Sequence, residues 1–447
     1  MITFNDTLEK TQECLLGWSR KDVLKKVTII RDVQGKISLL FENTEYPEET
    51  AIAELQLRLE QGLHNFYAKR LFWKKLSSSQ KRNKENVGVE IIAEIVENSR
   101  AYWNKKENID FYVAERPIAK KAWVNTTALQ QPVWTYEDAI QGNGTKIITF
   151  YSFKGGMGRT TALAGVALIL AEQGKNVMMI DMDVEAPGLS TLFFEEDAVK
   201  TGVLDYLLEK PLDESRSVRD YVLSVSDPAL MKEDDGNLYL MPAGKVDANY
   251  LQKLARIDYQ DNRENYLKMT VQKMLTELRQ EYQVDYILVD ARAGFHDMGG
   301  IAVAQIPHGA VLIGNASKQS WDGLTQVIHT IAQCHRKDDF SIMIVDSMCE
   351  RATSDRALQQ REEFLNMAYA VCVDNYYDKE DAMPGIDADE VEHKPEYIPF
   401  DAELLQGFEL FSSGKSESDG VVKAYRELLT GKVYQAIVQR IKSWFGE

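Results

Sequence analysis

The stretch Lys154-Gly155-Gly156-Met157-Gly158-Arg159-Thr160-Thr161 decides how this chain is expected to fold. An apolar run before it, residues 147–151 (IITFY), predicts a strand, and residues 162–173 (ALAGVALILAEQ) predict a helix that starts where the glycines end. Glycines let the backbone curl until successive N–H groups point inward, and the helix N-terminus adds partial positive charge. The stretch therefore predicts a loop that holds a polyphosphate.

Two further apolar runs end in aspartate. Residues 177–180 (VMMI) lead into Asp181 and Asp183, and residues 286–289 (YILV) lead into Asp290. A strand, a helix and a second strand at this separation predict a right-handed βαβ unit, which places the carboxyl ends of both strands at one edge of a parallel sheet. We therefore expect these aspartates beside the glycine loop, and favour this over carboxylates that merely end strands.

Together the three segments resemble the deviant P-loop ATPases of the ParA/MinD family, whose loop reads K-G-G-x-G-K-[ST]-[ST]. The family also has a D-x-D switch and a hydrophobic strand that ends in D-x-x-x-G. The resemblance covers residues 145–447 and implies that ATP and Mg²⁺ are sandwiched in a homodimer that forms with ATP. It implies nucleotide contacts from Lys154, Gly155, Gly156, Met157, Gly158, Arg159, Thr160, Thr161, Asp181 and Asp290.

The resemblance also assigns roles to individual residues. Lys154 would be catalytic by reaching the phosphates held by the other subunit, and Asp183 by orienting the attacking water. The metal ligands would be Thr160, Asp183 and Asp290, directly or through water. The implied function is a switch that regulates partner proteins, with membership of a multi-protein bacterial system, partitioning-like or anti-phage, as a speculative extension.

Two residues depart from the family pattern. Phe153 stands where the ordinary Walker pattern has glycine, and Arg159 stands where the family has a phosphate-contacting lysine. Arginine is a wide planar fork in place of a compact ammonium, so the replacement is not conservative. We therefore expect nucleotide binding to be retained and hydrolysis to be slow.

Two alternative functions stay open. One is a P-loop protein tyrosine kinase, whose family carries a tyrosine-rich tail; here the nearest matches are Tyr376, Tyr377, Tyr425 and Tyr434. The other is a module that binds nucleotide without hydrolysing it and signals through its shape.

The composition sets limits on the class of protein. The chain has 447 residues, of which 44% are hydrophobic, enough for more than one core. A net charge of -17 argues against a surface that binds nucleic acid or membrane as a whole. Four scattered cysteines, and the lack of a leader-like or membrane-spanning apolar run, predict a soluble cytoplasmic protein with reduced thiols.

The predicted fold class is α/β: a doubly wound, mostly parallel P-loop sheet at residues 145–447, preceded by a small α+β domain. That domain is expected at residues 1–125, with a linker at 126–144, and would recognise a protein partner or trigger. Residues 27–30 and 37–41 predict a hairpin. Residues 47–76 and 87–104 predict helices, the second with Ile91 and Ile95 turned inward.

Four other segments have a functional and a plainer interpretation. The basic stretch 69–84, with Phe72 and Trp73, could bind nucleic acid, but we favour a solvated charge run. The C-terminal helix 431–445 could lie on a membrane, but we favour packing on the sheet. The acidic segment 378–392 lacks calcium-loop spacing and predicts a surface insertion. The resemblance to the ParA/MinD family implies that the purine lies near Asp346 and residues 397–400.

Overall fold

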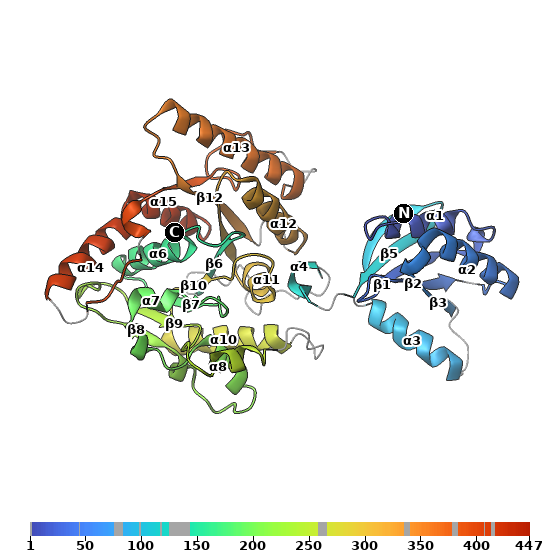
Figure 1. Cartoon of the computed structure of the whole chain (residues 1–447), viewed down its shortest axis with the longest axis horizontal. Helices are drawn as coiled ribbons and strands as arrows, with labels where there is room; N and C mark the ends of the chain where they lie inside the picture. The colour runs from blue at the N-terminus through green and yellow to red at the C-terminus, as the bar shows by residue number, and fades with distance from the viewer. Residues whose placement is uncertain are drawn as a thin grey trace. The chain divides into compact units, whose positions relative to one another are not determined.

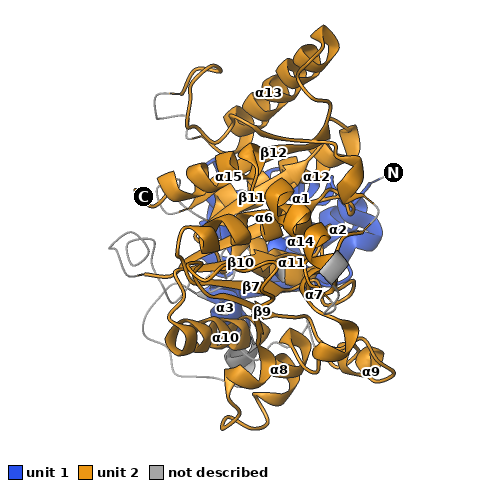
Figure 2. Ribbon diagram, turned by 90° about the vertical axis from the view of Figure 1, so that its left-hand side faces the viewer, with its two compact units in different colours: residues 1–130 blue, residues 131–447 orange. Residues whose placement is uncertain are grey.

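The computed structural model describes residues 2–43, 45–75, 84–97, 100–116, 119–124, 144–257, 266–334, 340–377, 383–405, 407–412 and 416–447. The chain divides into two compact units, Met1–Gln130 and Gln131–Glu447 (Figure 1, Figure 2). All of the expected linker except Gly144 lies outside the described residues. Each unit is therefore described by itself.

The first unit is built on a five-stranded mixed sheet with the order β3-β2-β1-β5-β4. Its strands are β1 (Lys26–Arg31), β2 (Ile37–Asn43), β3 (Tyr67–Lys75), β4 (Ala101–Lys106) and β5 (Ile109–Glu115). Its helices are α1 (Thr7–Leu16), α2 (Glu49–Leu63), α3 (Lys84–Glu97) and α4 (Lys121–Val124), with 3₁₀ turns η1 (Lys21–Val23) and η2 (His64–Phe66). The predicted hairpin is confirmed, because β1 and β2 pair antiparallel with Ile29 opposite Leu39.

Both faces of this sheet are covered. Since side chains alternate along a strand, Ile29 and Phe41 face the core shared with α1 and α2, while Ile30 and Leu40 face α3. The first core also buries Trp18. The small α+β domain expected before the ATPase region is thus a sheet with helices on its two sides.

The two long helices predicted for this unit were wrong in extent. The first ends at Leu63 and is followed by β3, which pairs parallel with β2 and stacks Trp73 on Phe41 at 4.0 Å. The second ends at Glu97, and β4 follows. Pairing with a growing sheet overrides local helix preference here, an influence that periodicity does not report.

The inward residues of the second helix were also assigned wrongly. Ile91 and Ile95 are 50% and 47% exposed, whereas Ala93 and Val96 are buried against the sheet. The basic stretch 69–84 lies partly on the edge strand β3, where Lys74 pairs with Glu97 at 2.8 Å. Residues 76–83 lie outside the described part of the chain, so the nucleic-acid interpretation stays open.

The second unit is built on an eight-stranded sheet with the order β13-β12-β11-β6-β10-β7-β9-β8. Its strands are β6 (Lys146–Ser152), β7 (Val177–Asp181), β8 (Leu223–Val225), β9 (Leu238–Met241), β10 (Tyr286–Asp290), β11 (Gly309–Gly314), β12 (Ser341–Cys349) and β13 (Glu396–Pro399). Neighbours are parallel except for the antiparallel pair of β8 and β9. The predicted fold class is confirmed.

Helices cover both faces of this sheet. They are α6 (Arg159–Glu172), α7 (Leu189–Phe193), α8 (Val203–Glu209), α9 (Tyr250–Leu254), α10 (Tyr266–Tyr282), α11 (Asp297–Ala304), α12 (Lys318–Cys334), α13 (Asp355–Asn375), α14 (Ser416–Leu429) and α15 (Lys432–Ser443). Short 3₁₀ turns are η4 (Glu196–Ala198), η5 (Val218–Tyr221) and η7 (Ala402–Leu404). Figure 1 shows α6, α14 and α15 on one side of the strands and α11 and α12 on the other.

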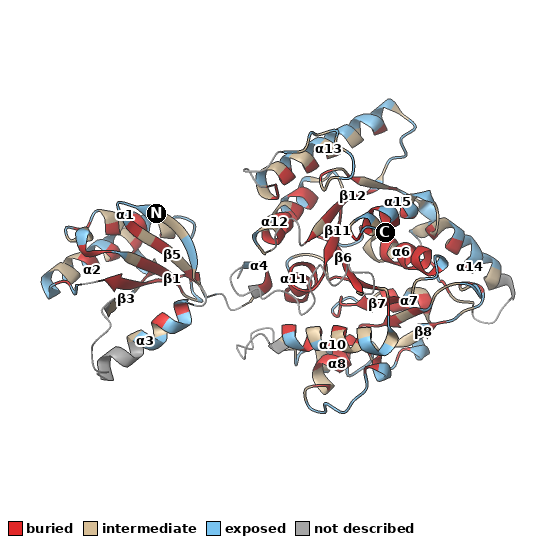
Figure 3. Ribbon diagram, turned by 180° about the vertical axis from the view of Figure 1, so that it is seen from behind, coloured by how far each residue is buried: buried red, intermediate tan, exposed pale blue. Residues whose placement is uncertain are grey.

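The strands β6, β7, β10 and β11 are buried throughout, and so are residues 162–171 of α6, as the red ribbon in Figure 3 shows. An apolar strand covered on both faces needs no polar alternation, which explains the unbroken hydrophobic runs in the sequence. This packing fixes the strand ends from which the site is built.

The C-terminal helix α15 packs in this core, as we favoured. Tyr434, Ile437, Val438 and Ile441 are buried against α6, and a Cβ on Gly165 would lie only 3.0 Å from the Tyr434 ring. Its apolar side is therefore already covered. Among the described helices, none has the length and apolar character needed to span a bilayer. In the acidic segment, Asp387, Asp389 and Glu390 are exposed, whereas residues 378–382 lie outside the described part.

Candidate functional site

The three predicted strand ends lie side by side. Strand β10 pairs with β6 on one side and β7 on the other, and Asp290 is in register with both Phe150 and Asp181. The glycine loop that follows β6 therefore begins beside the aspartates that end the other two strands. The strand register alone brings the separate motifs together.

The glycine loop has the curled backbone that its sequence predicts. Gly156 and Gly158 adopt positive φ angles of 73° and 70°, which side chains rarely tolerate, and α6 begins directly afterwards at Arg159. Met157 is 3% exposed and anchors the loop, since its carbonyl accepts a 2.8 Å hydrogen bond from the Ser347 hydroxyl. The loop is thus fixed from below and open above.

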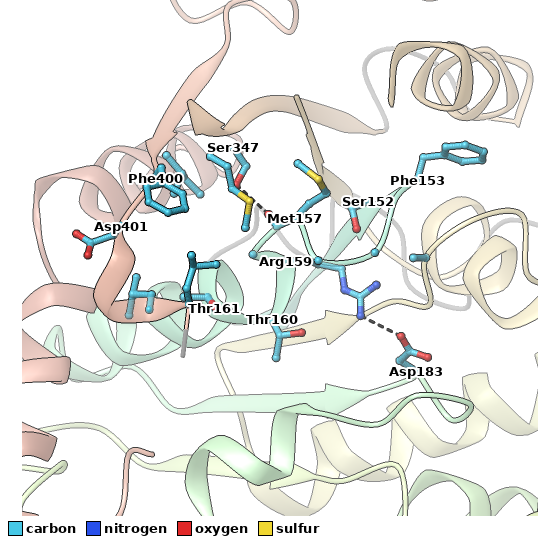
Figure 4. Close-up of a pocket in the computed structure, with 18 of the residues that line it drawn as sticks. Ser152, Phe153, Met157, Arg159, Thr160, Thr161, Asp183, Ser347, Phe400 and Asp401 are labelled. Atoms are coloured by element: carbon cyan, nitrogen blue, oxygen red, sulfur yellow. Dashed lines mark hydrogen bonds and ion pairs between the residues drawn. The ribbon is translucent and has the colours of Figure 1, made fainter. Parts of the chain in front are cut away.

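A cavity of about 710 Å³ opens over this loop (Figure 4). Of the predicted site residues, it is lined by Gly155, Gly156, Met157, Gly158, Arg159, Thr160, Thr161 and Asp183. Lys154 is exposed beside it but does not line it, and neither Asp181 nor Asp290 reaches its wall. The cavity is large enough for a small-molecule ligand.

Arg159 turns toward the carboxylates at the base of the site. Its Nε donates to Asp290 Oδ1, and its Nη2 donates to Asp183 Oδ2 at 3.1 Å, a contact drawn in Figure 4. The Thr160 hydroxyl donates to the other oxygen of Asp290 at 2.7 Å. The residue expected to contact phosphate therefore bridges the two aspartates expected to face the metal.

This bridge is buried, which makes its charges strongly interdependent. The side chains of Arg159 and Asp290 are 11% and 2% exposed. Burial acts against the charge on Arg159, but the carboxylates of Asp290 and Asp183 outweigh it and raise the pKa of the guanidinium. Burial raises the pKa of Asp290, while Arg159 and Thr160 act to lower it.

Asp181 holds the segment that follows it. Its carboxylate accepts hydrogen bonds from the backbone N–H groups of Asp183, Gly188 and Leu189 at 3.0, 3.1 and 3.0 Å. Burial, followed by the nearby charge of Asp290, raises its pKa to about 7. It shapes the turn from β7 to α7 from outside the cavity wall, so direct contact with a nucleotide stays a prediction.

The oxygen atoms present suit Mg²⁺ in combination with phosphate. Thr160, Asp183 and Asp290 offer a hydroxyl and carboxylates, the hard ligands that Mg²⁺ prefers. Within the described ranges, no group of three or more His, Cys, Asp or Glu side chains is placed to hold a metal ion by itself. Because Mg²⁺ at phosphate sites keeps several waters and substrate oxygens, a complete protein cage is not required.

Phe153 points away from the glycine loop. Its ring lies 4.9 Å from that of Phe295, between centroids, and a Cβ on Gly323 of α12 would come within 2.0 Å of it. The missing side chain at Gly323 makes room for the aromatic residue. The departure from glycine at this position therefore leaves the positive-φ turn intact.

At the opposite end of the cavity, the sequence predicted only the stretch 397–400, of which Ile398, Pro399 and Phe400 line the wall. That end is apolar and comes from the end of β13 and the turn after it, from the end of β12 and from α15; its lining includes Ser347, Met348, Ile398, Pro399, Phe400, Leu404, Leu405 and Tyr434, with Asp401 as a charged neighbour. Asp346 does not line the cavity. Burial raises its pKa to about 7, with Arg361 of α13 acting in the opposite direction.

A second missed residue is Arg292, which lines the phosphate end. Its Nη1 donates to Asp183 Oδ1 at 2.9 Å, and its Nη2 lies 3.2 Å from Glu185 Oε2. Its position two residues after Asp290 was the available signal. A residue just beyond a strand end in a parallel sheet is well placed to face a ligand.

A positive-φ glycine loop, a following helix and nearby strand-end aspartates are the features of a P-loop. Residues 145–344 match the family model described as "AAA domain" (AAA_31). That part of the chain is therefore similar to this family.

Curated proteins resemble parts of this chain. The "Uncharacterized ATP-binding protein MJ0169" of Methanocaldococcus jannaschii is 31% identical over 150 residues, 34% of this chain and 46% of that protein. The septum site-determining protein MinD of Bacillus subtilis is 29% identical over 147 residues, 33% of this chain and 45% of that protein. The chain spans about half the length of these relatives.

Solved structures also resemble part of this chain. One described as "Structure of pnob8 ParA" is 17% identical, with a TM-score of 0.46, and the match covers 67% of this chain and 99% of that one.

Proposed function

We propose that this chain binds ATP with Mg²⁺, hydrolyses it slowly and uses the nucleotide to switch between monomer and dimer, so regulating a protein partner. The observation that supports this most strongly is the cavity over the glycine loop. The loop's curled backbone, the Thr160 hydroxyl and the Asp183 carboxylate all meet there. This combination serves a polyphosphate better than any other ligand class.

In this proposal, each part of the phosphate end has a task. The backbone of residues 155–161 holds the phosphates, Thr160, Asp183 and Asp290 would hold Mg²⁺, and Asp183 orients the attacking water. Bound Mg²⁺ neutralises charge that develops on the transferring phosphoryl group. Lys154 is exposed at the rim, which leaves it available to the phosphates of a second subunit.

Arg159 supplies a reason for slow turnover. Its guanidinium must leave Asp183 and Asp290 before those carboxylates can serve a metal or a water. A lysine offers a single point charge in place of a two-carboxylate bridge. We expect Arg159→Lys to release phosphate faster than the unmodified chain in a steady-state assay.

Steady-state phosphate release by the full chain tests the hydrolysis itself. We expect slow, Mg²⁺-dependent release that Lys154→Ala reduces about 100-fold, as for other groups that stabilise developing charge. Lys175→Ala is a matched control, because that lysine pairs with Glu447 away from the cavity. If Lys154→Ala and Lys175→Ala release phosphate at the same rate, that release does not depend on this site. The alternative of a module that binds nucleotide without hydrolysing it would then be favoured.

Sedimentation tests the dimer. We expect Asp183→Ala to bind ATP and accumulate as a dimer, because the variant cannot orient water for the step that resets the switch. A chain that stays monomeric with ATP, in both the unmodified and the Asp183→Ala form, would contradict the switch.

We extend the proposal to residues 1–125 as the part that recognises a protein partner or trigger, in a partitioning-like or anti-phage system. Its support is a separate sheet and core, which can present a surface of their own. Affinity purification of the full chain, with and without ATP, tests this. A partner retained equally by residues 145–447 alone would contradict it.

Burial of three of the four candidate tyrosines weighs against the kinase alternative, whereas Tyr425 is half-buried. Tyr376 and Tyr377 are 8% and 6% exposed, and their hydroxyls bond to the Phe340 carbonyl and to His393 at 2.8 and 2.7 Å. Tyr434 is 4% exposed. A kinase would need its target hydroxyl free to reach a phosphate.

A further inference from the structure

Arg292 joins two loops on opposite sides of the phosphate end. It follows β10, but its guanidinium contacts Asp183 and Glu185, which both follow β7. Glu185 in turn accepts from His296 Nε2, just before α11. A chain of polar contacts therefore runs from the cavity wall to the start of α11.

We propose that Arg292 is the residue that distinguishes a nucleoside triphosphate from a diphosphate, with Glu185 as the competing ligand that it leaves when the terminal phosphate arrives. The inference deepens the proposed function, since it names how the same site senses its ligand. It concerns a residue outside the glycine loop and the two aspartate motifs.

Arg292 has the access that this role needs. Its side chain lines the cavity and is 27% exposed, against 11% for the side chain of Arg159. Its backbone is held in place from below: a Cβ on Gly299 of α11 would lie 2.8 Å from the Arg292 carbonyl oxygen. Because the backbone of Arg292 is fixed and its guanidinium is partly exposed, the side chain can change partners without moving the loop.

Competition at Asp183 makes such a change favourable. Both oxygens of this one carboxylate accept from guanidinium groups, Oδ1 from Arg292 and Oδ2 from Arg159. Two cations therefore share one anion, in addition to the bonds that each makes elsewhere. A terminal phosphate carries more negative charge than a carboxylate and matches the planar arginine fork, so it is a stronger partner.

Release of Glu185 by Arg292 would transmit the presence of the terminal phosphate to the segment that follows β7. His296 Nδ1 accepts from the Met298 N–H at 3.2 Å and caps α11, so the neutral ring donates to Glu185 through Nε2. When Arg292 moves to phosphate, Glu185 loses its contact to Arg292 and keeps the contact to His296. The segment between Asp183 and Gly188 is then tied less firmly to the loop after β10.

Calorimetric titration of the full chain with ATPγS and with ADP, both with Mg²⁺, tests the inference. We expect the unmodified chain to prefer ATPγS, and Arg292→Ala to lose about 10-fold of that preference while its ADP affinity is kept. Glu185→Gln should act in the opposite direction and raise ATPγS affinity alone, because it weakens the competing ligand. Arg219→Ala is the matched control: this arginine of η5 is 67% exposed, pairs with Glu281 and does not line the cavity.

Several outcomes would overturn the inference. Arg292→Ala could have the same ratio of ATPγS affinity to ADP affinity as Arg219→Ala. Alternatively, Glu185→Gln could lower the affinity for ATPγS. Either result would mean that Arg292 only connects the two loops. If Arg292→Ala fails to fold by circular dichroism, Arg292→Lys and Glu185→Gln decide the question, since the lysine keeps the charge without the fork. Failure of the unmodified chain to bind either nucleotide would instead remove the proposed function.

Discussion

The phosphate end and the apolar end of the cavity are built in opposite ways. At the phosphate end, charged side chains satisfy one another: Asp183 and Asp290 both bond to Arg159, and Arg292 adds a second link. At the apolar end, Phe400 and Leu405 are 48% and 54% exposed, and the charged neighbour Asp401 pairs with Arg351 at the surface.

The two ends therefore contribute differently to the stability of the fold and to ligand affinity. Buried ion pairs at the phosphate end contribute to the folded state before any ligand arrives, so a ligand must compete with them. Exposed apolar surface at the other end contributes little until a flat ring covers it. Changes at the first end should therefore affect stability, and changes at the second should affect affinity.

The largest effect is expected for Asp290→Ala. The substitution leaves Arg159 buried with only Asp183 as a carboxylate partner, so the free energy of unfolding should fall by about 3 kcal/mol. Chemical denaturation followed by circular dichroism measures it. The control is Asp401→Ala, whose partner Arg351 has a 68% exposed side chain and whose loss should cost less than about 1 kcal/mol. An equal loss of unfolding free energy in the two variants would contradict the claim that the two ends contribute differently to stability.

A pH-dependent effect is expected for Asp346→Asn. The folded-state pKa of Asp346, about 7, lies above its ordinary value of 3.8, so the folded chain holds this proton more tightly than the unfolded chain does. The contribution of Asp346 to stability is complete below pH 3.8 and is lost as the pH rises through 7. Relative to the unmodified chain, Asp346→Asn should therefore gain stability across this window, by at most about 1.4 kcal/mol per pH unit.

Melting temperatures of the two proteins between pH 5 and pH 8 measure this difference. Glu447→Gln should show the reverse trend below pH 4.5, so its melting temperatures are compared between pH 3 and pH 5. Lys146 and Lys175 overcome the effect of burial and hold the pKa of Glu447 at about 2, so its contribution is lost only as the pH falls toward that value. An Asp346→Asn difference that does not change with pH would show that the carboxyl stays ionised in the fold.

The smallest effect is expected for Phe400→Ala. Loss of an aromatic surface against a base should weaken nucleotide binding about fivefold, or about 1 kcal/mol, and leave the free energy of unfolding unchanged. Titration with a nucleotide measures the affinity, and the melting temperature serves as the control. An unchanged affinity would place the base elsewhere.

The same contrast explains how far the sequence predicted the site. The phosphate end was predictable because its residues lie in three short motifs, each fixed to a strand end by register. Positive φ at positions 156 and 158 favours glycine, and the aspartates follow recognisable apolar strands. Both features can therefore be read from the sequence. The contacts of Arg159 with Asp183 and Asp290 were not predictable, because the partners of a long side chain depend on which residues the packing brings near it.

The apolar end was predicted only in part. Phe400 lies in the stretch 397–400 that was expected near the purine, whereas Ser347 and Tyr434 come from distant segments with the composition of any core. The same reason explains the errors in the first unit, where β3 carries residues such as Leu71 and Trp73 that suit a helix or a strand until β2 provides a partner. Local patterns predict local geometry, and distant pairing decides the rest.

The central claim is that three strand ends converge on one polyphosphate. A crystal structure of the full chain with Mg²⁺ and a slowly hydrolysed ATP analogue tests it most directly. We expect the phosphates on the backbone N–H groups of residues 155–161 and the base against Phe400. An analogue bound elsewhere, or crystals without nucleotide at saturating concentration, would contradict the account.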